Sequence, residues 1–233
     1  MTLKALLTRW FDELLPRACL LCGARARAPV CADCAADLPR LSGPLCPVCA
    51  RPLGAPAQAC GACLKAPPAF DATLAPLVYA FPVDGLVHQL KYGCRLPSAE
   101  FFSRVMLAGS RPTGDLLMPV PLSPQRLRER GFNQALEIAR PLASALGLPI
   151  DATSLYRQRD TLPQSRLPWR ARQGNVRHAF ACRRDLAGLT VIVVDDVMTT
   201  GATLAAVATA LKARGAAHVV NWVATRAVSR GPA

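Results

Sequence analysis

Unbroken apolar runs alternate with segments of helical periodicity along this chain. The run from Leu189 to Val194 is β-branched and lacks polar alternation, which predicts a strand buried on both faces, as in a parallel sheet. Residues 116–122, LLMPVPL, predict a second buried strand, and Thr73–Tyr79 predicts a third. Helices are expected over 83–91, from Asn133 onward and from about Ala202 to Ala213. Strands alternating with helices in this order predict an α/β fold.

The first 15 residues show a different pattern. Apolar residues recur at helical spacing from Leu3 to Leu14, while Arg9, Asp12 and Glu13 interrupt the apolar core that a secretory leader needs. We expect an amphipathic helix over 1–15, packed on its own protein rather than on a membrane because its charges are mixed. No segment reaches the roughly 18 consecutive apolar residues of a membrane span, so we expect a cytoplasmic protein.

Ten cysteines are the second strong signal of the sequence. Eight of them form four C-x-x-C pairs, the spacing at which two thiolates reach one tetrahedral zinc ion. A disulfide framework is the alternative, but repeated C-x-x-C pairs in a reducing compartment favour metal. We therefore expect two structural zinc ions, with these ligands: Cys19, Cys22, Cys31, Cys34, Cys46, Cys49, Cys60 and Cys63.

The four C-x-x-C pairs, each a zinc knuckle, can share two zinc ions in two ways. Consecutive pairs give two tandem ribbons, whereas a cross-braced form joins the first pair to the third and the second to the fourth. We favour the tandem form because the gaps within each half are short and Pro39–Pro44 has the composition of a connector. The proline-bearing segment KAPPAF then marks a boundary. The expected units are the helix at 1–15, a double zinc ribbon at 16–66 and an α/β domain at 67–233.

The chemistry concentrates after the strand at 189–194. Asp195 and Asp196 should lie at the carboxyl end of that strand, the edge at which open α/β sheets bind ligands. After two intervening residues the chain continues with Thr199, Thr200, Gly201 and Thr203, which open a helix whose amino terminus favours an anion. Two carboxylates can accept hydrogen bonds from a sugar diol, and the loop can hold a phosphate. This order of residues indicates a site for a phosphorylated ribose.

Other interpretations of the loop are weaker. The sequence contains neither the glycine-lysine-serine/threonine end of a Walker loop nor the spaced glycines of a dinucleotide fold. An ordinary helix-capping turn remains the alternative. Capping accounts for one acid or threonine, however, and not for two acids, three threonines and a glycine in one turn.

Basic segments precede the acidic pair. Arg126, Arg128 and Arg130 come after the strand at 116–122 as a cationic loop that could receive a diphosphate, although a solvated helix start would look similar. Lys91 is a candidate phosphate contact or a solvated surface residue. Residues 157–180 contain many arginines and little periodicity, which is typical of a long mobile loop or lid.

The overall charge widens the choice of partners. The net charge of +13 is carried mostly by arginine, with only four lysines. Arginine binds phosphate bidentately, so phosphorylated small molecules and nucleic acid are both plausible partners, and acidic proteins are a third class.

Together these segments resemble the ComF family of bacterial competence-associated proteins, which join a double zinc ribbon to a phosphoribosyltransferase domain. The resemblance covers nearly the whole chain. Its motifs are the four C-x-x-C knuckles, LKYG at 90–93, PVPLSPQRLRERGFNQA at 119–135, Arg157-x-Arg159-x-Thr161-x-x-Gln164 with Arg172, Asn175-Val176 and Ala179-Phe180, and VVDDVMTTGAT at 193–203.

The resemblance implies a type I phosphoribosyltransferase-like parallel sheet flanked by helices, with a small amino-terminal zinc module. It also implies a donor, phosphoribosyl diphosphate (PRPP), with Mg²⁺ bridging its diphosphate and ribose oxygens. Asp195 and Asp196 would hold the ribose, and residues 121–130 and 159–172 would form the pyrophosphate and catalytic loops, with Arg159 and Arg172 as catalytic candidates. The remaining expected PRPP contacts are Val197, Met198, Thr199, Thr200, Gly201, Ala202, Thr203, Arg126, Arg130 and Lys91.

The sequence supports three hypotheses for function. The first is an enzyme of the pentosyltransferase class that transfers phosphoribosyl to an unidentified nitrogen acceptor, in DNA uptake or nucleotide salvage. The second is a zinc-dependent competence factor that binds single-stranded DNA and in which PRPP binding is regulatory. The third is a zinc module that docks proteins of the competence machinery.

Overall fold

A computed structural model describes residues 17–93, 95–158 and 179–228. The helix expected over 1–15 lies outside these residues, and so do Arg159 and Arg172. None of the helices within the described ranges is long and apolar enough to cross a membrane.

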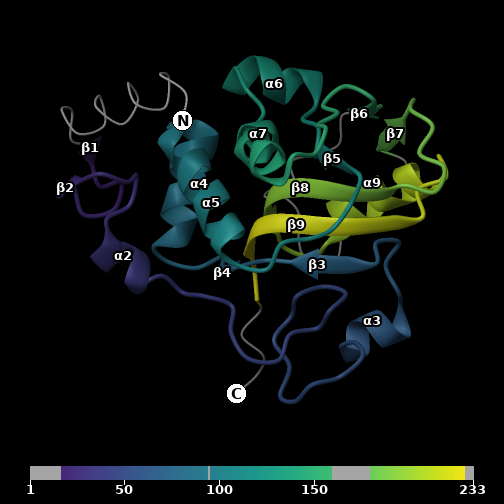
Figure 1. Ribbon diagram of the computed structural model, residues 1–233, viewed down its shortest axis with the longest axis horizontal. Coiled ribbons are helices and arrows are strands. Elements are labelled where there is room, and N and C mark those ends of the chain that lie inside the picture. Colours follow the sequence, from purple (N-terminus) through teal and green to yellow (C-terminus); the bar gives the residue numbers. More distant parts are fainter. Residues whose placement is uncertain (1–16, 94, 159–178, 229–233) are drawn as a thin grey trace.

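A parallel sheet forms the centre of the molecule, in the order β3, β9, β8, β5, with β4 also paired to β9 (Figure 1). Every pairing within it is parallel. The expected α/β class is therefore confirmed. The strands are β3 Ala72–Leu74, β4 Leu77–Val78, β5 Leu116–Pro119, β8 Thr190–Met198 and β9 His218–Arg226.

Three strand predictions need correction. Strand β8 does not end at Val194, because its pairing with β9 continues to Met198, so both aspartates lie within the strand. Strand β5 ends at Pro119 rather than at 122. The strand expected over 73–79 is split into β3 and β4 around Pro76, which has no N–H to donate to a ladder. The Pro76 carbonyl instead accepts from Leu41 N at 3.0 Å.

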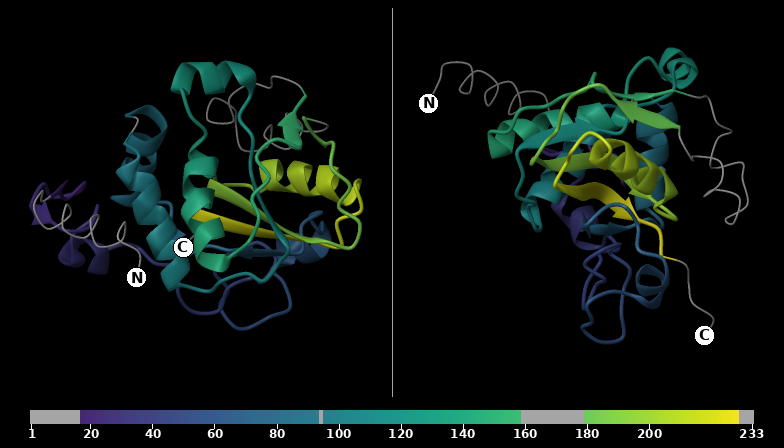
Figure 2. Two further views of the ribbon diagram at one scale, coloured as in Figure 1. Left: turned by 45° about the horizontal axis from the view of Figure 1, so that its top comes forward. Right: turned by 90° about the vertical axis from the view of Figure 1, so that its right-hand side faces the viewer.

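Helices cover both faces of the sheet (Figure 2). On one face, α4 (Val83–Tyr92), α5 (Pro97–Ala108) and α7 (Gln134–Leu146) share an apolar cluster with Ile192 and Trp222. On the other face, α9 (Ala202–Lys212) packs in a second cluster with Val191, Val193 and Val223. Alternate residues of β8 thus enter different clusters, which is why the run at 189–194 shows no polar alternation.

A short antiparallel hairpin contains both ends of the segment that the sequence predicts as a loop over 157–180. Strand β6 (Leu155–Arg157) pairs antiparallel with β7 (Phe180–Cys182), and Arg157 lies opposite Phe180. The two ends of the predicted loop are therefore strand residues, and residues 159–178 lie outside the described part of the chain.

The cysteine-rich region docks on the sheet at two separate places. Its first half contains β1 (Arg17–Ala18), β2 (Arg25–Ala26) and α2 (Ala32–Ala36), and its second half contains α3 (Gly61–Lys65). Figure 1 shows α2 and α3 far apart, at different ends of the sheet. The connector between them runs along β4, where Val78 N donates to Pro39 O at 2.8 Å. The connector thereby extends the sheet by an antiparallel bridge at Arg40 and Leu77.

Candidate functional site

The loop after β8 and the first turn of α9 form one wall of a small hollow. Asp195 and residues 197–204 line it. Thr200 Oγ1 accepts a hydrogen bond from Ala202 N at 3.2 Å, which stabilises the turn into the helix. The first amides of a helix have no acceptor within the helix and carry its positive dipole end, so this wall suits an anion.

Gly201 gives this loop its shape. Its φ of +83° lies in the left-handed region, which glycine adopts without the steric cost that a Cβ brings. A Cβ at Gly201 would also lie 2.8 Å from Met198 Cε and 3.6 Å from the Phe70 ring. Met198 and Phe70 are both buried, so the underside of the loop is closely packed.

Asp196 contacts the helices on the other side of the site. Its carboxylate forms an ion pair with Lys91 of α4 and accepts a hydrogen bond from Gln134 Nε2 of α7 at 3.3 Å. Thr225 Oγ1 donates to its backbone carbonyl at 2.9 Å. Asp196 is only 3% exposed, so this carboxylate is a buried charge held by the Lys91 cation and by the Gln134 amide.

The two neighbouring acids differ in their proton affinity. Burial, together with the repulsion of the Asp196 carboxylate, raises the pKa of Asp195 well above its ordinary value. Burial also disfavours the charged form of Asp196, but the Lys91 ammonium and the hydrogen bonds outweigh it and lower the pKa of Asp196. Lys91 thus holds Asp196 in its ionised form, and the oxygens of both carboxyl groups can accept hydrogen bonds from a sugar diol.

The arginine segment after β5 is a helix, not the loop that the sequence predicts. Helix α6 spans Pro124–Arg130, with Ser123 Oγ accepting from Arg126 N at 3.4 Å as its N-cap. Proline suits the first helical position because its missing N–H needs no partner there. Only residues 121–123 of the expected pyrophosphate loop over 121–130 precede the helix.

Helix α6 brings one arginine to the acids. Arg130 NH1 donates to Gln134 Oε1 at 2.5 Å, and the same Gln134 side chain donates to Asp196. The guanidinium carbon of Arg130 also lies 5.5 Å from the centroid of the Tyr92 ring. Arg126 is one helical turn earlier on α6, on the same side as Arg130.

One chain of contacts therefore runs through four side chains: Lys91, Asp196, Gln134 and Arg130. It lies beside the hollow that is lined by Asp195 and the loop after β8. Lys91 is paired with an acid rather than solvated at the surface. Gln134 is not among the residues that the sequence predicts, although it ends the RGFNQ run that begins at the last residue of α6. An amide in a helical segment carries no charge signal, so only its contact with Asp196 reveals it.

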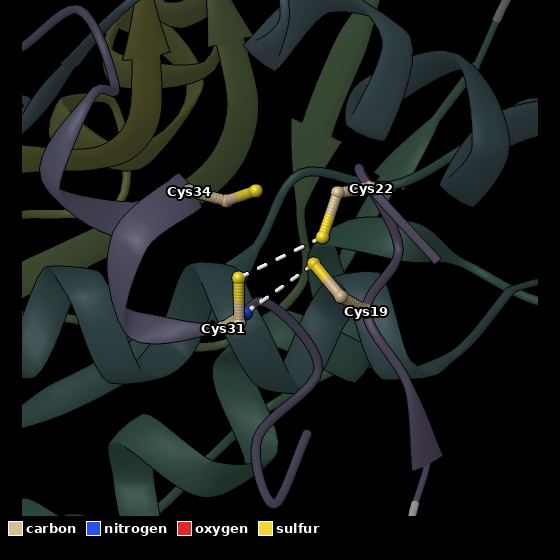
Figure 3. Close-up of side chains that lie close together, drawn as sticks. All are labelled: Cys19, Cys22, Cys31 and Cys34. Carbon is tan, nitrogen blue, oxygen red and sulfur yellow. Dashed lines mark hydrogen bonds between the residues drawn. The ribbon is translucent and has the colours of Figure 1, made fainter. Parts of the chain in front are cut away.

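The cysteines form two tetrads in sequential order, which confirms the tandem arrangement. The sulfurs of Cys19, Cys22, Cys31 and Cys34 all lie within 4.8 Å of one another, and so do those of Cys46, Cys49, Cys60 and Cys63. Figure 3 shows the first four side chains pointing toward a common centre. Each tetrad takes its third and fourth ligands from the start of a short helix, α2 or α3.

The tetrads fit zinc in their geometry. A tetrahedral ion with Zn–S bonds of ~2.3 Å places its sulfurs about 3.8 Å apart. Cys22 and Cys31 have their sulfurs 3.8 Å apart, and Cys49 and Cys60 have theirs 3.6 Å apart. Backbone amides donate to the thiols, as Cys31 N does to Cys19 Sγ at 3.3 Å and Cys60 N to Cys46 Sγ at 3.2 Å. Such donors support thiolate ligands.

Comparison with known proteins supports both the zinc-binding region and the α/β domain. Residues 10–64 match the double zinc ribbon domain, and residues 129–228 match the phosphoribosyl transferase domain. The DNA utilization protein YhgH of Salmonella typhi is 37% identical over 91% of this chain and 98% of its own. The chain belongs to the ComF family. Competence protein F of Haemophilus influenzae, a second ComF relative, is 28% identical over 87% of this chain and 92% of its own.

Among solved structures, the glutamine PRPP amidotransferase of B. subtilis aligns with 54% of this ComF chain and 25% of its own, with 21% identity and a TM-score of 0.38. The phosphoribosyl transferase match spans α7, β8, α9 and β9, and with them the turn from β8 into α9, residues 198–204, called the threonine loop below. In this member of the ComF family, the double zinc ribbon match contains all the cysteines of the two tetrads. The match and the two tetrads together support structural zinc.

Proposed function

We propose that the chain binds PRPP at the carboxyl edge of its sheet and transfers the phosphoribosyl group to a nitrogen nucleophile, in DNA uptake or nucleotide salvage. One observation carries the proposal: the acids, the anion-favouring loop and two cationic side chains, Lys91 and Arg130, surround the same end of β8. A phosphorylated sugar with a diphosphate needs these three groups together.

Each group would have a distinct role. The ribose hydroxyls would hydrogen-bond to Asp195 and Asp196, and the 5-phosphate would accept from amides and hydroxyls of residues 197–203. The diphosphate would be bound by Lys91, Arg126 and Arg130, since charge-assisted donors bind phosphate strongly. Arg159 and Arg172 are proposed as catalytic residues by resemblance alone, because they lie outside the described residues.

The reaction forms a bond from the acceptor nitrogen to C1 of the ribose and breaks the C1–O bond, and the diphosphate leaves with the electron pair. Arginine and lysine donors that gain strength as this charge develops lower the barrier. Mg²⁺, when bound with PRPP, would supply further neutralisation of the leaving group, and carboxylate oxygens such as those of Asp195 and Asp196 are suitable neighbours for this hard cation.

Release of diphosphate tests the transferase. The protein is incubated with PRPP, Mg²⁺ and a panel of purine and pyrimidine bases and simple amines. We expect release that depends on one acceptor, and we expect it to fall by about 100-fold in Asp195→Asn/Asp196→Asn. If no acceptor raises release above that of the double variant, the proposed transfer reaction is wrong.

A second candidate function rests on surface charge. Exposed arginines occur on α6 and on the cysteine-rich region, among them Arg128, Arg25 and Arg27, and the net charge is +13. We propose single-stranded DNA as the alternative partner, in agreement with the name of the Salmonella relative. Binding should weaken steeply as salt rises. Failure to retard single-stranded DNA at low salt would remove this candidate.

Two further expectations belong to this proposal. The division into 16–66 and 67–233 is proposed as the boundary between the zinc-binding module and the transferase domain. A reducing compartment such as the cytoplasm suits the proposal, because the ligands of zinc are reduced thiolates.

A further inference from the structure

Arg226, the last residue of β9, is a buried cation that none of the sequence motifs indicates. The residue is buried, at 2% exposure, and its guanidinium lies within hydrogen-bonding distance of four backbone carbonyls. Nε donates to Cys49 O at 2.8 Å, and the two N–H groups of NH1 are shared among three carbonyls, Met198 O at 3.1 Å, Ala227 O at 2.5 Å and Thr199 O. One planar group thus ties a cysteine of the second tetrad to two carbonyls of the threonine loop.

The second tetrad is electrostatically suited to this partner. Four thiolates around one Zn²⁺ carry a net charge of about −2. A guanidinium removed from water needs such compensation, because an unpaired buried charge is strongly unfavourable. The geometry of the tetrad fits zinc, so the metal-bound module would hold Arg226 in place, and Arg226 would hold the loop.

Packing links the same two parts. Cys46, Cys49 and Cys60 belong to the apolar cluster that contains Phe70 and Met198 beneath the loop. The first tetrad differs, since Cys19 belongs to the cluster on the opposite face of the sheet, with α4 and α5. The two tetrads are therefore not equivalent with respect to the loop.

We propose that Arg226 is a positioning residue that fixes the threonine loop to the second cysteine tetrad, so that metal at the second tetrad, and not at the first, maintains the conformation of the loop. Any effect of Arg226 on PRPP affinity rests on the proposed function. Its effect on the conformation of the loop is independent of that function and can be measured in the ligand-free protein.

Hydrogen exchange of the full chain without ligand tests the first step. Arg226→Lys keeps the charge but loses the planar fork that reaches several carbonyls at once. We expect exchange in peptides covering 198–204 to rise roughly tenfold, as for the loss of about one net hydrogen bond. Arg111→Lys is the control, because Arg111 Nε also donates to a carbonyl, Leu107 O at 2.9 Å, but is exposed just after the end of α5. Unchanged exchange at 198–204 in Arg226→Lys would overturn the proposal.

A matched pair of cysteine variants tests the second step. Cys34 and Cys63 are the last ligands of their tetrads and are both partly buried. We expect Cys34→Ser and Cys63→Ser each to lower the zinc content from two ions to one, while only Cys63→Ser raises exchange at 198–204. Protected amides at 116–118 would show that the sheet is still folded. Equal effects of the two variants, or none, would contradict the proposal. If Cys63→Ser unfolds the sheet as well, the effect of the metal is not confined to the loop and the metal-dependent part of the proposal fails, while Arg226→Lys still decides the role of Arg226.

A PRPP titration separates this inference from the proposed function. If the wild type binds PRPP, Arg226→Lys and Cys63→Ser should weaken binding by roughly tenfold relative to Arg111→Lys and Cys34→Ser. If the wild type does not bind PRPP, the proposed function fails while the exchange data still decide the role of Arg226.

Discussion

At the scale of single residues, the site depends on how one buried carboxylate is neutralised. Asp195 and Asp196 are adjacent in the sequence, but Asp195 lines the hollow of the loop and Asp196 contacts α4 and α7. The acidic pair and the threonines could be predicted from the sequence because their order is distinctive. Gln134 and Arg226 could not, because their importance arises only from contacts with residues distant in the sequence.

Removing the partner of Asp196 should be costly. Lys91→Met leaves a buried carboxylate without its cation, and we expect the free energy of unfolding to fall by about 2 kcal/mol, less than for a fully buried pair because the Lys91 side chain is 23% exposed. Lys91→Met/Asp196→Asn should recover most of this loss. Urea unfolding of the two single variants and of the double variant gives the coupling energy between Lys91 and Asp196. Additive losses would show that the ion pair contributes nothing to stability.

At the scale of elements, hydrophobic pattern predicts which strands and helices exist better than it predicts where they end. The extension of β8 to Met198 is due to its ladder with β9, and the break between β3 and β4 is due to Pro76 and to the connector at Leu41. The arginines of helix α6 show no apolar periodicity, which is why the pattern predicts a loop there; the N-cap Ser123 and Pro124 are the helix signals that the sequence contains.

The junction of β8 and α9 gives a prediction about backbone conformation. Gly201→Ala places a Cβ at a φ of +83° and 2.8 Å from Met198 Cε, and we expect a loss of about 2 kcal/mol in stability. Gly188→Ala is the matched control, since Gly188 has a φ of +75° but nothing within 4 Å of the added Cβ, and it should cost about 1 kcal/mol. Thermal unfolding measures both. Equal losses would mean that the loop is not closely packed.

At the scale of the whole molecule, the cysteine-rich region is part of the framework of the site. Its connector extends the sheet at β4, its first tetrad packs with α4 and α5, and its second packs beneath the threonine loop. The sequence indicates two zinc modules and one α/β domain, but not which module touches which face, because that depends on contacts made only after folding.

Binding of PRPP is the central claim, and calorimetric titration tests it most directly. The full chain with zinc bound is titrated with PRPP in the presence of Mg²⁺, alongside Asp195→Asn/Asp196→Asn, whose two carboxamides remove the negative acceptors without adding bulk. We expect saturable binding by the wild type at one site and a loss of at least about 100-fold in affinity in the variant, since two charge-assisted hydrogen bonds are removed. Equal affinity of the two proteins, or no binding by either, would contradict the account.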